Sequence, residues 1–71
     1  MKIAIVGGTG TFGRALARKL RLLGEDVYIG SRDAQRAKER ALEIGVKGDS
    51  NEHVVKGVDL VVLATKSNAA I

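Results

Sequence analysis

Apolar and polar residues alternate along the chain in short blocks of two different periods. Two segments, 2–6 and 59–64, each consist of one charged residue followed by a continuous apolar run, and a shorter run lies at 27–29. Such runs are typical of strands buried on both faces of a parallel sheet. Residues 11–23 instead repeat large apolar side chains every three or four positions, with arginines on the opposite face. This second period predicts an amphipathic helix between the first two strands.

The intervening sequence predicts one more helix and two minor elements. Residues 33–44 carry a thin apolar stripe made mostly of alanine and start at a capping residue, either Asp33 or Ser31. The minor elements are a strand stub at 46–48 and a helical turn at 51–56. Strands and helices therefore alternate along the chain.

This alternation predicts an α/β fold with right-handed crossovers and a parallel sheet flanked by helices. The order matches the first, mononucleotide-binding half of a doubly wound, Rossmann-type fold. Because the pattern stops where another helix would start, we expect residues 1–71 to be a half-domain of a longer chain. We also expect the last strand to be an open edge, which leads to homo-oligomers or packs against further sequence.

A glycine-rich loop joins the first strand to the first helix. It contains Gly7, Gly8, Gly10 and Gly13, which satisfy both the Gly-x-Gly-x-x-Gly and the Gly-x-x-Gly-x-x-Gly spacing of dinucleotide-binding proteins. In such loops one glycine permits a sharp turn, one leaves room for the pyrophosphate, and the last lets the helix pack closely. The helix N-terminus adds unpaired N–H groups. We therefore predict a dinucleotide site whose loop residues are Gly7, Gly8, Thr9, Gly10, Thr11, Phe12 and Gly13.

The end of the second strand indicates which dinucleotide binds. NAD-binding proteins of this class carry an acid there, whereas this chain has Gly30-Ser31-Arg32. Ser31, Arg32 and Arg36 suit a 2′-phosphate, since a guanidinium group can donate two hydrogen bonds at once. We expect Arg32 and Arg36, four residues apart, on one helix face. The sequence thus favours NADP(H) over NAD(H), with solvated surface arginines as the alternative.

A further part of the site is expected at the carboxyl end of the last strand, where ligands bind in open α/β sheets. Ala64, Thr65 and Lys66 lie there, and they border the nicotinamide or the pyrophosphate unless this segment is a plain loop. The chain holds no nucleophile–base pair and no paired carboxylates. We expect it to bind its cofactor and to catalyse nothing by itself.

Composition excludes several other functions. With 71 residues, 45% of them apolar and 28% charged, the chain is a folded protein too short for a two-domain enzyme. A net charge of +4 favours an anionic partner, but Phe12 and Tyr28 alone are too few aromatics for a nucleic-acid stacking surface. There is no long apolar run and no cysteine, and the single His53 cannot build a metal site. We expect a cytoplasmic protein that binds a small dinucleotide and neither nucleic acid nor membrane.

Three segments resemble NADPH-dependent coenzyme F420 reductases, archaeal and actinobacterial enzymes that move hydride between NADP and a deazaflavin. These segments are Gly7-Gly8-Thr9-Gly10-x-x-Gly13, the residues 29–34, and Val46-Lys47-Gly48-x-x-Asn51. The resemblance covers the cofactor-binding half of that fold. It implies that Thr9, Ser31, Arg32 and Arg36 hold the 2′-phosphate end, and that coenzyme F420 is the co-substrate of the parent enzyme. One departure is Lys66, where the family tends to have proline.

Three alternatives share parts of this pattern. Archaeal prephenate dehydrogenases have a similar Gly-Gly-Thr loop and a similar short connection at 44–46, and atypical short-chain reductases share the Gly-x-x-Gly-x-x-Gly spacing with a following arginine. A non-catalytic module that senses NADP would have the same fold. The Gly30-Ser31-Arg32-Asp33 segment favours the F420 reductases.

Overall fold

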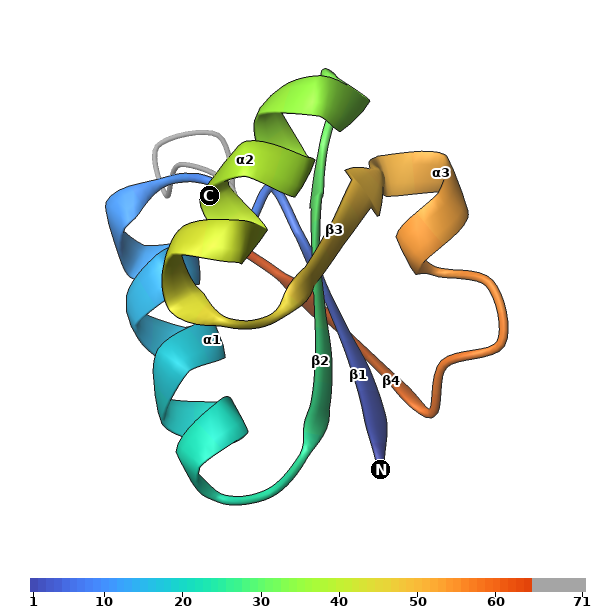
Figure 1. Cartoon of the computed structure of the whole chain (residues 1–71). Helices are drawn as coiled ribbons and strands as arrows, with labels where there is room; N and C mark the ends of the chain where they lie inside the picture. The colour runs from blue at the N-terminus through green and yellow to red at the C-terminus, as the bar shows by residue number, and fades with distance from the viewer. Residues whose placement is uncertain (65–71) are drawn as a thin grey trace, which may run out of the picture.

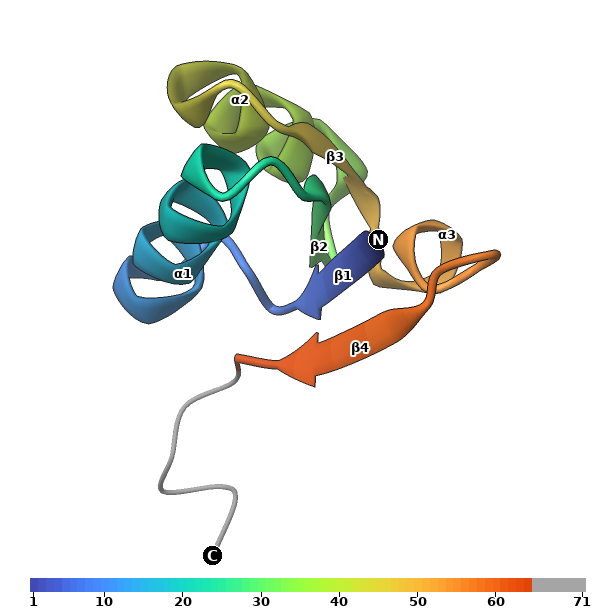
Figure 2. The same cartoon turned by 90° about the horizontal axis from the view of Figure 1, so that it is seen from below.

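The computed structural model describes residues 1–64, which form a four-stranded parallel sheet with helices on both faces (Figure 1). The elements are, in chain order, β1 (Lys2–Val6), α1 (Thr11–Leu22), β2 (Asp26–Ser31), α2 (Ala34–Ile44), β3 (Lys47–Ser50), α3 (Asn51–Val54) and β4 (Leu60–Leu63). Figure 2 shows α1 and α2 on one side of the sheet and α3 on the other. The predicted Rossmann-type α/β half is confirmed.

The strand order is β3-β2-β1-β4, with every neighbouring pair parallel. Ile3 of β1 pairs with Val27 of β2 on one side and with Leu60 of β4 on the other. All four carboxyl ends consequently lie at the same edge of the sheet. Within residues 1–64, β4 is an outer strand, as the sequence predicts.

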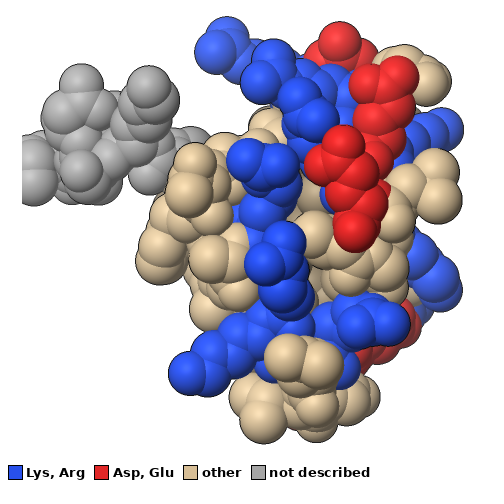
Figure 3. All heavy atoms as spheres, turned by 60° about the vertical axis from the view of Figure 1, so that its left-hand side comes forward, with Lys and Arg blue, Asp and Glu red and all other residues tan. Residues whose placement is uncertain are grey.

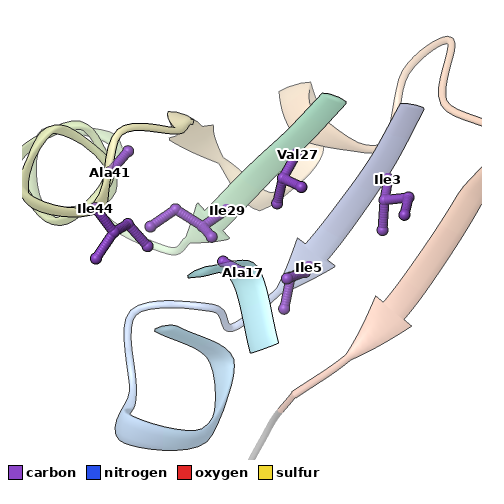
Figure 4. Close-up of a cluster of buried hydrophobic side chains, with 7 residues drawn as sticks. All are labelled: Ile3, Ile5, Ala17, Val27, Ile29, Ala41 and Ile44. Atoms are coloured by element: carbon purple, nitrogen blue, oxygen red, sulfur yellow. The ribbon is translucent and has the colours of Figure 1, made fainter. Parts of the chain in front are cut away.

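The hydrophobic core lies between the sheet and the helices α1 and α2 (Figure 4). Alternate residues of the two central strands point into it, and Ile5 and Ile29 are completely buried. Burial of one such side chain contributes about 1.5–3 kcal/mol. The small residues Ala17 and Ala41 face them from the helices, so the helices approach the sheet closely. This packing fixes the ends of β1 and β2, where the chain leaves the core.

Helix ends follow the chemistry of their flanking residues. Asp33 caps α2, because its carboxylate accepts hydrogen bonds from the backbone N–H groups of Gln35 and Arg36. The same helix ends at Gly45, whose φ of 75° is left-handed. Of the two residues predicted as its cap, Asp33 is the correct one. No helix in residues 1–64 has the length and apolar character needed to cross a membrane.

The structure corrects the predicted position of the third strand. It covers Lys47–Ser50 rather than 46–48, and it pairs with β2 from Tyr28 to Ser31. Its sequence is polar because it lies at the sheet margin, where side chains reach water. Gly48 has no space for a side chain, since a Cβ there would collide with the carbonyl group of Ala37 in α2. Tertiary packing, not an apolar pattern, sets this strand.

Candidate dinucleotide-binding site

A cleft of about 550 Å³ opens at the carboxyl edge of the sheet. Each strand contributes to it at or just beyond its carboxyl end, which is where open α/β sheets bind ligands. The volume lies within the range of small-molecule sites. The lining residues are Gly7, Thr9, Gly10, Ser31, Arg32, Asp33, Arg36, Asn51 and Ala64.

The start of the glycine loop is fixed by hydrogen bonds from two consecutive backbone N–H groups. Gly7 has a φ of 74°, which only glycine adopts readily, and its N–H donates to the side-chain oxygen of Asn51 at 3.2 Å. The N–H of Gly8 donates to the carbonyl of Gly30 at 2.9 Å. The chain therefore turns off β1 at Gly7.

Gly10 differs from its neighbours because the fold itself does not require glycine there. A Cβ at this position would meet nothing within 4 Å, and its φ of −76° suits any residue. The position lines the cleft, so the space that the missing side chain leaves is available to a ligand. This observation fits a phosphate group that approaches the backbone.

The N-terminus of α1 adjoins the same loop. Gly10 is its N-cap residue, no side chain caps the helix, and no acid lies in the first turn. The first N–H groups of a helix have no partner within the helix, and together with the helix dipole they attract an anion. The start of α1 is thus suited to the phosphates of a dinucleotide.

The polar end of the cleft follows β2, and it contains the predicted Ser31, Arg32 and Arg36. One detail of the prediction is wrong. Arg32 does not lie on the helix with Arg36, because α2 starts at Ala34 and Asp33 is its cap. The chain turns at Asp33 and still brings both arginines to one cleft. Among residues 1–64, neither guanidinium group pairs with a carboxylate, whereas Arg14 and Arg40 both pair with Glu43.

Not every predicted loop residue reaches the cleft. Gly8, Thr11, Phe12 and Gly13 do not line it, and the Phe12 side chain is 65% exposed. Ala64 does line it, at the end of β4. The predicted Thr65 and Lys66 lie outside the described residues.

Asn51 is the lining residue whose role the residue patterns missed. Only the family resemblance connects Asn51 with the site; the residue patterns predict it as the start of a helical turn. A signal was present, since Asn51 begins the predicted helical turn that comes shortly after the predicted strand stub, near the carboxyl edge of a parallel sheet. The polar sequence of β3 concealed where that strand ends.

The basic residues of α1 lie elsewhere. Figure 3 shows Lys and Arg side chains in a band on the side of the molecule formed by α1, with acidic side chains next to them. Arg14 lies 3.8 Å from the carboxylate of Glu43, and Arg21 donates to the carbonyl of Gly45 at 3.1 Å. Part of this band is therefore engaged in contacts between α1 and the end of α2.

The sequence matches the family of coenzyme F420-dependent NADP oxidoreductases from residue 2 to residue 71. The chain belongs to this family. The resemblance that the glycine loop and the 29–34 segment indicate is thereby confirmed.

Curated members and a solved structure agree with the family match. The F420-dependent NADP reductase of Methanothermobacter marburgensis is 42% identical over 71 residues, which are 100% of this chain and 32% of that protein. The corresponding reductase of Methanothermobacter thermautotrophicus is 40% identical and is matched by 97% of this chain over 34% of its own length. A crystal structure named as an F420-dependent NADP reductase of Arthrobacter sp. FB24 superimposes with a TM-score of 0.81 at 38% identity, covering 99% of this chain and 36% of that one. The chain thus spans about a third of the length of these F420 reductase relatives.

Proposed function

We propose that this chain is the NADP(H)-binding part of an oxidoreductase that transfers hydride between NADPH and coenzyme F420. The observation that carries the proposal is the composition of one cleft. It combines Gly10, where the fold leaves unused space, with Arg32 and Arg36, which pair with no carboxylate in residues 1–64. The family match supports the same cofactor.

The cleft residues divide into two binding regions. Gly10 and the N-terminus of α1 hold the pyrophosphate through backbone N–H groups, and Gly7 supplies the turn that places them. As the family resemblance implies, Thr9, Ser31 and the guanidinium groups of Arg32 and Arg36 hold the ribose 2′-phosphate end through charge-assisted hydrogen bonds. Asp33 lines the same cleft, and its carboxylate is held against the N-terminus of α2, where its Oδ1 atom accepts hydrogen bonds from the N–H groups of Gln35 and Arg36.

The remaining part of the cofactor extends toward the end of β4. Ala64 lines the cleft there. We also propose that Thr65 and Lys66, the next residues in the sequence, border the nicotinamide or the pyrophosphate. When bound, the nicotinamide supplies or accepts the hydride. The chain orients the cofactor, and this type of transfer depends mainly on how the two rings are positioned.

The site for the deazaflavin belongs to another part of the enzyme. The lining residues of the cleft include no nucleophile–base pair, and the F420 reductases are about three times as long as this chain. We further propose that the outer strand β4 packs against a second copy or against such additional sequence, in a cytoplasmic enzyme. Its Leu63 side chain is 72% exposed in the described structure.

Calorimetric titration of the 71-residue chain with NADPH and with NADH tests the proposed cofactor. We expect NADPH to bind more tightly, because the two ligands differ only in the 2′-phosphate. Equal affinities, or no binding of either, contradict the proposal. Mixing the chain with NADPH and coenzyme F420 should give no absorbance change above the uncatalysed rate, and turnover would show that the acceptor site has been misplaced.

A further inference from the structure

The amide side chain of Asn51 connects the ends of two strands that are not neighbours. Asn51 is the first residue of α3 and directly follows β3, whereas Gly7 directly follows β1. The Oδ1 atom of Asn51 accepts the N–H of Gly7 at 3.2 Å, across 44 residues of sequence. Because β2 lies between β1 and β3, this hydrogen bond spans the end of the central strand.

The end of β2 is shaped to let this side chain pass. A Cβ on Gly30 would lie 2.6 Å from Asn51 Oδ1 and 2.6 Å from a methyl group of Val54. Gly30 does not have a positive φ, so backbone conformation does not require glycine at this position. Glycine is required there because α3 approaches the end of β2 too closely for a side chain. Val54 is only 3% exposed and anchors the short helix that carries Asn51.

We infer that Asn51 is a positioning residue that holds the glycine loop in its binding conformation. The inference rests on the proposed function and deepens it. Gly7 is the turn at which the loop leaves β1. Without Asn51, the Gly7 N–H loses the hydrogen bond that fixes this turn. Fixing Gly7 places Thr9 and Gly10, which line the cleft with Asn51, before the ligand arrives. Such preorganisation lowers the cost of binding.

The role of Asn51 differs from that of Arg32 in one measurable respect. The glycine loop contacts the pyrophosphate, which NADP(H) and NAD(H) share. Loss of the Asn51 contact should therefore weaken the binding of both ligands. A residue that contacts the 2′-phosphate affects NADP(H) alone.

The experiment compares Asn51→Ala, Asn51→Asp and the control Glu52→Ala, a neighbouring exposed residue of α3 that does not line the cleft. We expect Asn51→Ala to raise the dissociation constants of both dinucleotides by about 3- to 10-fold, the range for loss of one neutral hydrogen bond. By amide hydrogen exchange, the Gly7 N–H should exchange faster in this variant. Glu52→Ala should match the parent in both measurements.

Asn51→Asp separates positioning from a general loss of structure. Its carboxylate still accepts the Gly7 N–H, so the Gly7 amide should remain protected in the absence of ligand. The added negative charge weakens binding at low salt, and the deficit relative to the parent should shrink as salt rises. A general loss of structure predicts neither the retained protection nor a deficit in affinity that salt reduces.

Three results overturn the inference. These are an Asn51→Ala variant that binds both dinucleotides as the parent does, a loss confined to NADP(H), and a Gly7 amide that exchanges equally fast in the parent and in Asn51→Ala. If the parent binds neither dinucleotide, the proposed function fails, and the Gly7 exchange rates still test the Asn51 contact. If Asn51→Ala does not fold, Asn51→Asp carries the test.

Discussion

Gly13, in the first turn of α1, lies against the backbone of Gly8, and a Cβ on Gly13 would come within 2.5 Å of the Gly8 Cα atom. The close contact is with the loop that leaves β1. The first turn of α1 thus packs on the glycine loop, backbone against backbone. Side-chain rotation cannot relieve a clash there.

Gly13→Ala should therefore destabilise the fold. Overpacking typically costs about 1–3 kcal/mol, which outweighs the gain of about 1 kcal/mol from alanine's higher helix propensity in all but the mildest case. In a chain of this size a net loss of 1 kcal/mol lowers the midpoint of thermal unfolding by roughly 4–8 °C. Thermal unfolding without ligand measures this, and an unchanged or raised midpoint would refute the close contact.

Gly10→Ala is the matched substitution with the opposite expectation. A Cβ at Gly10 meets no protein atom within 4 Å, so the unfolding midpoint should stay within a degree or two of the parent or rise. NADPH affinity should fall, because the new methyl group occupies the space assigned to the pyrophosphate. Calorimetric titration measures the affinity. If Gly10→Ala binds NADPH as tightly as the parent does, the pyrophosphate does not lie next to residue 10.

Arg32→Ala tests the 2′-phosphate assignment. Loss of a charge-assisted hydrogen bond costs about 1.5–3 kcal/mol, so NADPH affinity should drop by roughly 10- to 150-fold while NADH affinity hardly changes. Lys38→Ala is the control, since it removes one exposed positive charge from α2 outside the cleft. Equal losses of affinity for both dinucleotides in Arg32→Ala would show that Arg32 does not contact the 2′-phosphate.

Ser31→Asp should move the cofactor preference in the opposite direction. It introduces at the end of β2 the carboxylate that NAD-binding proteins of this fold use to hold the ribose 2′-hydroxyl, and it repels the 2′-phosphate. The ratio of NADPH to NADH affinity should fall by at least tenfold. A ratio that stays as in the parent would place the 2′-phosphate away from Ser31.

The outer strand β4 should make the 71-residue chain associate. Leu60, Val61 and Leu63 are 46%, 45% and 72% exposed, and an outer strand offers unpaired backbone groups to another chain. Leu63→Lys should shift the population toward monomer in sedimentation velocity, with the circular dichroism spectrum unchanged. A parent chain that is a stable monomer at every concentration tested would contradict this expectation.

The sequence correctly predicts those elements that depend on residues close together in the chain. The apolar run of β1, the glycine loop and the capping residue Asp33 each depend on residues close together in the chain. β3 was misplaced because its register depends on Gly48 packing against α2, a contact no local pattern encodes. Asn51 was missed for the same reason, since its partner Gly7 lies 44 residues away. Arg32 and Arg36 were correctly assigned to one cleft, although a turn at Asp33 and not a shared helix face brings them together.

The hydrogen bond from the Gly8 N–H to the Gly30 carbonyl makes the cleft a product of strand pairing. Neither the glycine loop nor the arginine end of β2 is in place unless β1 and β2 are aligned, which requires the 23 residues between the paired positions Ile5 and Ile29 to form the crossover. Local separation of β1 from β2 should displace the glycine loop and the arginine end of β2 together, so both parts of the proposed dinucleotide site are lost at once. A ligand that binds only the native form stabilises it by mass action. In the proposed site, dinucleotide binding is therefore thermodynamically linked to the pairing of β1 and β2, and a bound dinucleotide should slow local unfolding of this strand pair.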